Sequence, residues 1–439
     1  MFLPERLRRL LGRDDSLVLT PLLVLFVALA LVGRGVDAFG GASGDENLYL
    51  FFARNLTHGH YAQLGSAHAD LYLWHGPGLP LLLAPLVALH VPLTVTRLIG
   101  PLALFGAVVL LHRTLRRETT PRVALAGAVA LGLYAPLWTL LPYLRNEPVA
   151  ILAVVVLIFG LVRHRTAKSR RHLLLAGGAL GYLVLLRVEY GYIVGLLLVL
   201  TLVLLIRRSL RPATLPITGV LAVALLVTTP WLIYTHSITG KVFYWGNSGG
   251  SNLYWMAAPY TGARGDWHSE IEVQSDPQLA AHRPFFRHLH SLPALEQDAA
   301  MRHQATHWIR DHPATYASHV LANAGRLVAN APYSFKPLSP IRSAVYALPA
   351  LALIAALAWA GSDGERRRRW RRPEVALLVA LAVLSVVLHL AVAAEPRLLM
   401  PLVPVALWLV ARAVGGAPHG AARRSVIPPD AYATIAERA

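Results

Sequence analysis

Long apolar runs recur along the chain, and short polar or basic segments separate them. About 20 mostly apolar helical residues cross a bilayer core about 30 Å thick, so these runs predict about ten transmembrane helices. We place them near residues 16–33, 94–112, 122–141, 148–162, 173–187, 190–206, 213–234, 342–361, 374–393 and 398–414. The sequence therefore predicts an all-α polytopic membrane protein.

One apolar run is too short and too broken to be a span. Leu79 to Val91 contains Pro80 and Pro85 and ends before Pro92, and proline removes a backbone hydrogen bond inside a helix. We therefore expect a helix that lies at the membrane interface. With this run left out, the basic loops all fall on the side of the N-terminus: 112–122, 163–171, 207–211 and 366–372. Because basic loops stay in the cytoplasm, we expect both termini inside a bacterial cell membrane and the other connections on its outer face.

The net charge of the chain agrees with the predicted membrane topology. Its formal net charge is +18, and hydrophobic residues make up 55% of the sequence. A basic soluble protein would be a candidate for nucleic-acid binding, but here most basic residues gather in the predicted inner loops. We expect the lipid bilayer as a partner and no nucleic acid. The sequence has no cysteine, which excludes disulfides, a thiol nucleophile and a cysteine-ligated metal.

The loop lengths divide the chain into parts. The longest outer loop has helical periodicity between residues 293 and 330, with a break at Pro313, and a loop of this length is usually functional. The parts are a basic N-terminus (1–15), a membrane module of about seven spans (16–234) with an outer loop at 34–93, a partly helical outer loop (235–341), about three further spans (342–414) and a disordered cytoplasmic tail (415–439).

Two adjacent carboxylates, Asp45 and Glu46, follow the first span on the outer face. Neighbouring carboxylates repel, which raises the pKa of one of them. One could then act as a general base while the other binds an acceptor or a metal. The structural alternative is that Asp45 caps a helix over Asn47 to Leu56. The two roles are compatible, so both carboxylates are candidate catalytic residues.

Four cations on the outer face could hold a phosphate: Arg145, Arg187, Arg397 and Lys241. A guanidinium group binds phosphate oxygens bidentately and stays charged when it is partly buried. Arg145 and Arg187 could instead form salt bridges with the nearby Glu147 and Glu189. Spacing alone leaves both alternatives open.

Other polar and aromatic residues on the same face are candidates for substrate binding: Tyr72, His75, Glu147, Glu189, Asn252, Tyr254 and Glu395. Ionisable groups near a membrane are costly, and they often mark functional sites. The His-x-His spacing of His58 and His60, taken with His75 and Asp45, leaves a divalent metal open as a cofactor. No cofactor is required by the pattern.

Short motifs occur in a characteristic order along the chain: Gly44-Asp45-Glu46, Ala53-Arg54-Asn55, Gly59 to Ala62, His75 to Pro80, Leu144 to Pro148, Gly246 to Tyr254 and Glu395 to Pro401. Together with the topology they resemble the GT-C membrane glycosyltransferases, in the bacterial branch of the protein O-mannosyltransferase and lipid A aminoarabinose transferase superfamily. The resemblance implies a sugar donor linked to polyprenyl phosphate, an essential acidic residue that maps onto Asp45, and basic residues near the donor phosphate.

The first hypothesis is therefore an inverting glycosyltransferase of the cell envelope. Asp45 would take a proton from a lipid, glycan or protein acceptor, and the arginines would hold the donor phosphate. A second hypothesis is a transporter or flippase of a lipid-linked sugar, and a third is a non-catalytic envelope scaffold. Transporters commonly have repeated halves and charges at the bilayer midplane. No internal repeat is visible here, and the candidate charges lie at helix ends, which favours the enzyme.

Overall fold

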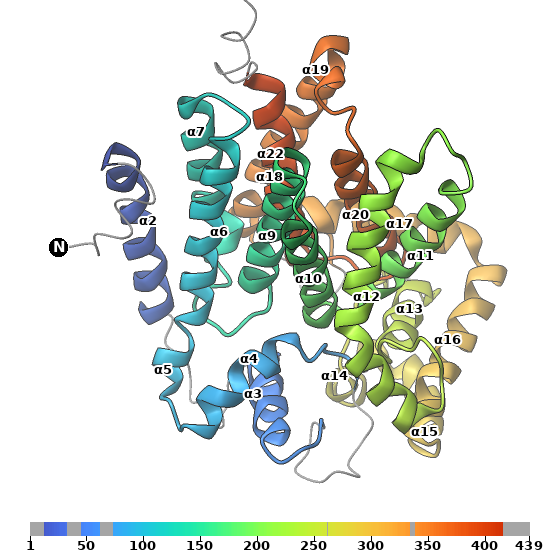
Figure 1. The fold of residues 1–439 in the computed structure, drawn as a ribbon. Coiled ribbons are helices and arrows are strands. Elements are labelled where there is room, and N and C mark those ends of the chain that lie inside the picture. Colours follow the sequence, from blue (N-terminus) through green and yellow to red (C-terminus); the bar gives the residue numbers. More distant parts are fainter. Residues whose placement is uncertain (1–12, 33–44, 62–72, 261, 334–338, 416–439) are drawn as a thin grey trace, which may run out of the picture.

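Figure 1 shows the computed structural model, which describes residues 13–32, 45–61, 73–260, 262–333 and 339–415. Within these ranges all regular elements are helices. Six helical runs are long and apolar enough to cross a membrane: Leu93–Leu115, Glu147–Ala167, Arg211–Thr239, Pro340–Ser362, Pro373–Ala391 and Pro396–Val414. The prediction of an all-helical membrane protein is confirmed.

The other four predicted spans fall on α2 (Arg13–Val32), α7 (Pro121–Gly132), α10 (Arg170–Leu186) and α11 (Glu189–Leu204). The apolar part of each helix is shorter than the six spans above, and in α2 and α10 charged residues precede it. The total of about ten crossings therefore stays a prediction. The run predicted at the interface forms α4 (Gly78–Ala88), which has only 11 residues.

The predicted helix at 122–141 is wrong in one respect, because the structure breaks it. α7 starts after Thr120, whose side chain accepts a hydrogen bond from the Val123 amide, and Pro121 fits the first helical position. The helix ends at Gly132, and α8 (Ala135–Trp138) follows as one short turn. Pro136 disfavours helical backbone at the residue before it and donates no hydrogen bond, which explains the break.

The long apolar helices form one bundle, in which α10 packs mainly against α9 (Glu147–Ala167) and α12 (Arg211–Thr239). α18 (Pro340–Ser362), α20 (Pro373–Ala391), α21 (Pro396–Leu399), η2 (Met400–Leu402) and α22 (Val403–Val414) complete it. α18 is largely uncovered, since only 6% of its apolar window is buried. An exposed apolar helix of this length is suited to contact with lipid.

Three of the predicted basic loops meet at one end of the bundle. Glu118, after α6 (Ile99–Leu115), pairs with Arg165 at 2.6 Å and with Arg412 at 3.0 Å. Arg165 also lies 3.2 Å from Glu374, beyond α19 (Gly364–Arg368). In Figure 1 the start of α7, α19 and the end of α22 lie at the top, whereas α3 (Asp45–Leu56), α4 and α15 (Arg283–His290) lie at the bottom. The basic loops and the helix that carries Asp45 and Glu46 thus lie at opposite ends of the bundle.

The chain between α12 and α18 folds into a small helical unit at that lower end. It contains α13 (Gly249–Ala257), α14 (Glu270–Ser275), η1 (Pro277–His282), α15, α16 (Ala294–Asp311) and α17 (Pro313–Ala329). The predicted helix break at Pro313 is confirmed. An aromatic core that includes Tyr254, Trp255 and Phe286 holds the unit together, and α17 packs on α18, α20 and α21.

Candidate active site

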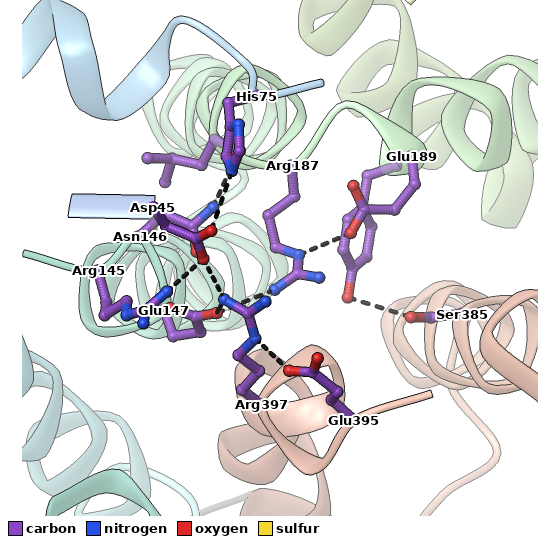
Figure 2. Close-up of polar contacts among 12 residues, drawn as sticks. Asp45, His75, Arg145, Asn146, Glu147, Arg187, Glu189, Ser385, Glu395 and Arg397 are labelled. Carbon is purple, nitrogen blue, oxygen red and sulfur yellow. Dashed lines mark hydrogen bonds and ion pairs between the residues drawn. The ribbon is translucent and has the colours of Figure 1, made fainter. Parts of the chain in front are cut away.

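Asp45 is the centre of a group of charged side chains at the lower end of the bundle (Figure 2). Its carboxylate oxygen Oδ2 accepts hydrogen bonds from Arg145, which precedes α9, and from Arg397 of α21. His75 Nε2 lies 3.7 Å from the other oxygen, Oδ1. Four segments that are far apart in the sequence therefore meet at one carboxylate, whose side chain is 21% exposed.

The charges around Asp45 control its ionisation. Burial alone would raise the pKa of the Asp45 carboxyl, but the His75 ring and the guanidinium groups of Arg397 and Arg145 hold it well below its usual range. The sequence left open which of the two carboxylates stays ionised, and the lowered pKa assigns that state to Asp45. The His75 ring and the arginine charges outweigh the effect of burial, so Asp45 is ionised at neutral pH.

His75 is placed by a tight turn before α4. Its carbonyl accepts a hydrogen bond of 2.8 Å from the Tyr61 hydroxyl, and the ring of Tyr49 packs edge-on against the imidazole at 5.0 Å. A Cβ on Gly76 would lie 2.1 Å from the Leu185 carbonyl oxygen, at the end of α10. Only glycine permits this approach, so the turn fixes the imidazole beside Asp45.

Glu46 points to different partners. It is fully buried and accepts two hydrogen bonds from Arg97, at 2.8 and 2.9 Å, and one of 3.0 Å from the Leu144 amide. This bidentate pair ties α3 to the start of α6 and to the segment that carries Arg145. The structure therefore does not bring Glu46 into the group around Asp45, although the two residues are adjacent in sequence.

A second layer of charges surrounds Arg397 and Arg187. Arg397 Nε donates to Glu395 at 2.5 Å, and its terminal nitrogen lies 3.9 Å from Glu147. Arg187 Nε donates to Glu189 at 2.7 Å and lies 3.7 Å from Glu147 through its terminal nitrogen. Arg187 thus forms the ion pairs that the sequence offered as the alternative to phosphate binding, as Figure 2 shows. Arg145 instead pairs with Asp45.

Glu147 has spare bonding capacity. Its side chain is buried, and the oxygen Oε2 has no hydrogen-bond partner among the residues that the structure describes. Buried carboxylate oxygens are nearly always hydrogen-bonded in folded proteins. This oxygen is therefore suited to accept a hydrogen bond from a bound hydroxyl group.

Several predicted site residues lie elsewhere. Lys241 stands 5.0 Å above the ring of Tyr244. Tyr254 is buried in the helical unit, with its hydroxyl 2.8 Å from His282 Nδ1, and Asn252 lies on the same helix, α13. Tyr72 lies outside the described residues. Among described residues no three histidine or acidic side chains converge to hold a metal ion.

Sequence reasoning missed two residues that shape the site. Tyr49 is one helical turn after Asp45 and is buried beside the Asp45 and Glu147 charges. Its i+4 spacing from Asp45 places both on one helix face, which is a signal that the sequence contains. Arg97 has a weaker signal, namely a single basic residue near the start of an apolar run. The structure adds its partner, Glu46.

An apolar cavity of about 300 Å³ lies among the helices next to α21, the helix that carries Arg397. α18, α20 and α22 supply most of its walls, and α17 adds Leu327 and Val328. Pro396 and Leu399, on either side of Arg397, line it as well. An apolar chain in this cavity would thus end close to a guanidinium group.

No protein-family model and no curated protein sequence matches the chain. Among solved structures, it is similar to that of ArnT from Cupriavidus metallidurans bound to undecaprenyl phosphate, with 15% identity, 92% of this chain and 78% of that chain covered, and a TM-score of 0.41. It is also similar to the archaeal oligosaccharyltransferase AglB from Archaeoglobus fulgidus, in complex with an inhibitory peptide and a dolichol-phosphate. The identity is 12%, 90% of this chain and 50% of that chain are covered, and the TM-score is 0.45.

The arabinosyltransferase EmbB from Mycobacterium smegmatis is also similar, with 18% identity, 94% of this chain and 42% of that chain covered, and a TM-score of 0.33. The chain therefore spans half or less of the length of AglB and EmbB. TM-scores below 0.5 describe a partial likeness. In fold, the chain is an all-helical membrane protein, and the solved structures similar to it include an arabinosyltransferase and an oligosaccharyltransferase.

Proposed function

We propose that the chain is a membrane glycosyltransferase of the GT-C type. It transfers a sugar from a polyprenyl-phosphate donor to a lipid, glycan or protein acceptor of the cell envelope, at the outer face of the membrane. The observation that carries the proposal is the ionised Asp45 carboxylate, which Arg145 and Arg397 hold, together with an apolar cavity whose lining includes Pro396 and Leu399 of the same short helix as Arg397. This arrangement offers a base, cations for a phosphate and space for a lipid chain in one place.

In the proposed reaction the Asp45 carboxylate takes the proton of the acceptor hydroxyl or amine. The acceptor atom forms a bond to C1 of the donor sugar while the bond from C1 to the phosphate oxygen breaks, with inversion at C1. The leaving polyprenyl phosphate keeps the electron pair, and Arg397 and Arg145 stabilise its charge. Atoms and charge balance without a metal or redox cofactor.

The paired arginines give this reaction an order. With both arginines bound, Asp45 is a weak base, because its pKa is low. A donor phosphate competes for the same guanidinium groups, and each contact that it removes from Asp45 raises the basicity of the carboxylate. Donor binding would therefore activate the base only when the sugar is in place. Glu147 Oε2 is suited to accept a hydrogen bond from a hydroxyl group of that sugar.

The apolar cavity supports a lipid-linked donor. A polyprenyl chain entering between α18 and α20 would lie along Leu353, Val383 and Leu399 and bring its phosphate to Arg397. Arg187 is enclosed by Glu147 and Glu189 and would act mainly by holding Glu147. A flippase would need charges along a path through the bundle, whereas the described ion pairs gather at its two ends.

The test is sugar transfer in reconstituted membranes by Asp45→Asn, with a polyprenyl-phosphate sugar as donor. Asparagine keeps the shape and hydrogen-bonding reach but is not a base, so transfer should fall at least 100-fold. Asp311→Asn, a similar change on the exposed end of α16, serves as the matched control and should transfer normally. Full transfer by a folded Asp45→Asn protein would remove Asp45 from the mechanism.

A further inference from the structure

A second cavity lies in the helical unit, on another face of α17. Its volume is about 610 Å³, and its lining is mainly polar: Tyr260, Arg264, Thr315, Ser318 and His319, with glycine, alanine and proline between them. No aspartate or glutamate is among the described residues that line it. A cavity of this size and polarity is suited to a hydrophilic ligand.

The backbone at Arg264 is costly for its residue type. Arg264 has a φ of 50°, between Gly262 at 82° and Gly265 at 75°. A long side chain rarely adopts this left-handed conformation, and such positions cost on the order of 1 kcal/mol. Two glycines in the same turn show that the turn itself favours glycine. Arginine at this position therefore indicates a role for its side chain.

The turn is anchored so that Arg264 stays at the cavity. The Arg326 guanidinium donates to the Arg264 carbonyl at 2.7 Å and forms a buried ion pair with Asp266. Gly265 packs against His319 of α17, with 3.2 Å between an added Cβ and that of His319. Asp266 is thus engaged by Arg326, whereas the Arg264 side chain has no ion pair among the described residues. The cavity consequently presents an exposed cation whose backbone is anchored.

The other polar groups can bind hydroxyls. His319 Nδ1 lies 2.9 Å from the Met256 carbonyl, which only accepts hydrogen bonds, so Nδ1 carries the proton and Nε2 is an acceptor. Ser318 donates its proton to the Thr315 carbonyl at 2.7 Å and keeps its oxygen as an acceptor. Tyr260 is 37% exposed, and aromatic rings of this kind pack against the apolar faces of sugar rings.

The chain that follows α17 runs from the cavity towards the turn that carries Glu395. Pro332 lines the cavity, and burial and then Glu395 raise the pKa of the next residue, Tyr333, while Arg326 opposes the rise. The Tyr316 hydroxyl donates to the Ala391 carbonyl at 2.8 Å, just before the turn that carries Glu395. α17 thus borders the apolar cavity with one face and the polar cavity with another.

We infer that the polar cavity binds the acceptor as an anionic carbohydrate, with Arg264 pairing with its carboxylate or phosphate and Ser318 and His319 accepting from its hydroxyls. The inference rests on the proposed sugar transfer and names the acceptor for it. A neutral glycan would form no ion pair with Arg264, and a lipid chain would meet polar walls.

The test is direct binding to the purified full chain in nanodiscs by calorimetry. Three probes separate the ligand chemistries: tetragalacturonate carries carboxylates, mannose 6-phosphate carries a phosphate, and maltotetraose is neutral. We expect one or both anionic probes to bind, and maltotetraose to bind at least tenfold more weakly, because a charge-assisted contact contributes at least a factor of about ten. Binding of maltotetraose as tight as that of both anions, or no binding of either anion, would overturn the inference.

Variants locate the site. Arg264→Gln should weaken binding of the anion at least tenfold, and Ala322→Phe, which fills the cavity and keeps the cation, should do the same. Arg287→Gln removes an equal charge from an exposed position on α15 and should bind as the wild type does. Unchanged binding in Arg264→Gln and Ala322→Phe would refute the site.

Binding and transfer can fail separately. Asp45→Asn should bind the anion normally, because Asp45 is outside the cavity lining. Anion binding together with no sugar transfer by the wild type would refute the proposed function and leave the cavity as a glycan site. Transfer that proceeds with Arg264→Gln at the wild-type KM would refute the acceptor role alone.

Discussion

The two adjacent carboxylates should respond to mutation in opposite ways. Glu46 is fully buried, and its partner Arg97 is 4% exposed. Glu46→Gln removes the charge that compensates Arg97 and weakens the two hydrogen bonds of 2.8 and 2.9 Å. Leaving one buried charge without its partner typically costs about 3–5 kcal/mol. The Leu144 amide can still bond to the glutamine oxygen, so the lower part of that range is expected.

Asp45→Asn should cost much less stability. Its side chain is 21% exposed, and both arginines retain other contacts or solvent. Ion pairs of this kind contribute about 1 kcal/mol. Glu46→Gln should therefore lower the melting temperature by about 6–12 °C, and Asp45→Asn by about 2–4 °C, given shifts of about 2–4 °C per kcal/mol in larger domains. For transfer the order reverses, because only Asp45 faces the proposed acceptor.

The assay is thermal unfolding in detergent, followed by tryptophan fluorescence, next to sugar transfer by the same preparations. Arg97→Met combined with Glu46→Gln removes both charges, and the double variant should be more stable than Glu46→Gln alone. A Glu46→Gln protein with wild-type melting temperature and no transfer would refute the structural role of Glu46. It would restore Glu46 as a catalytic residue.

Three further predictions follow from the packing and the titrating groups. Gly76→Ala would place a Cβ 2.1 Å from the Leu185 carbonyl oxygen, so it should cost about 2 kcal/mol or more in unfolding; Gly364→Ala, where no atom lies within 4 Å, should not. Burial and then His268 lower the pKa of His282 to about 4 from 6.5. The unfolded chain therefore binds that proton more tightly than the folded chain does. About 2–3 kcal/mol of folding stability should be lost as the pH falls from 6.5 to 4. Thermal unfolding of His282→Gln should lack this part of the pH dependence. Ala406→Trp, which fills the apolar cavity, should raise the KM for a long polyprenyl donor and leave that for a two-isoprene donor unchanged, and equal KM changes would argue against the cavity as the lipid site.

The sequence by itself determined the all-helical membrane class and the positions of most helices, although not the break between α7 and α8. One soluble core cannot bury so many apolar runs of about 20 residues, so their number predicts a membrane protein. Local signals also set helix ends, as Pro121 does after Thr120 and as Pro313 does between two surface helices. Loop charge placed the acidic loop opposite the basic loops, and the structure has these groups at opposite ends of the bundle. Such features depend on neighbouring residues or on composition, which a sequence contains.

Only the tertiary structure decided what each charged residue contacts. Successive residues point about 100° apart around a helix, so Asp45 and Glu46 meet different segments: Asp45 contacts Arg145 and Arg397, whereas Glu46 contacts Arg97. These partners are separated by about 50 to 350 positions, and no local pattern encodes such pairings. The shift in the pKa of Asp45 also depends on the tertiary structure, because the fold decides which cations lie near the carboxylate.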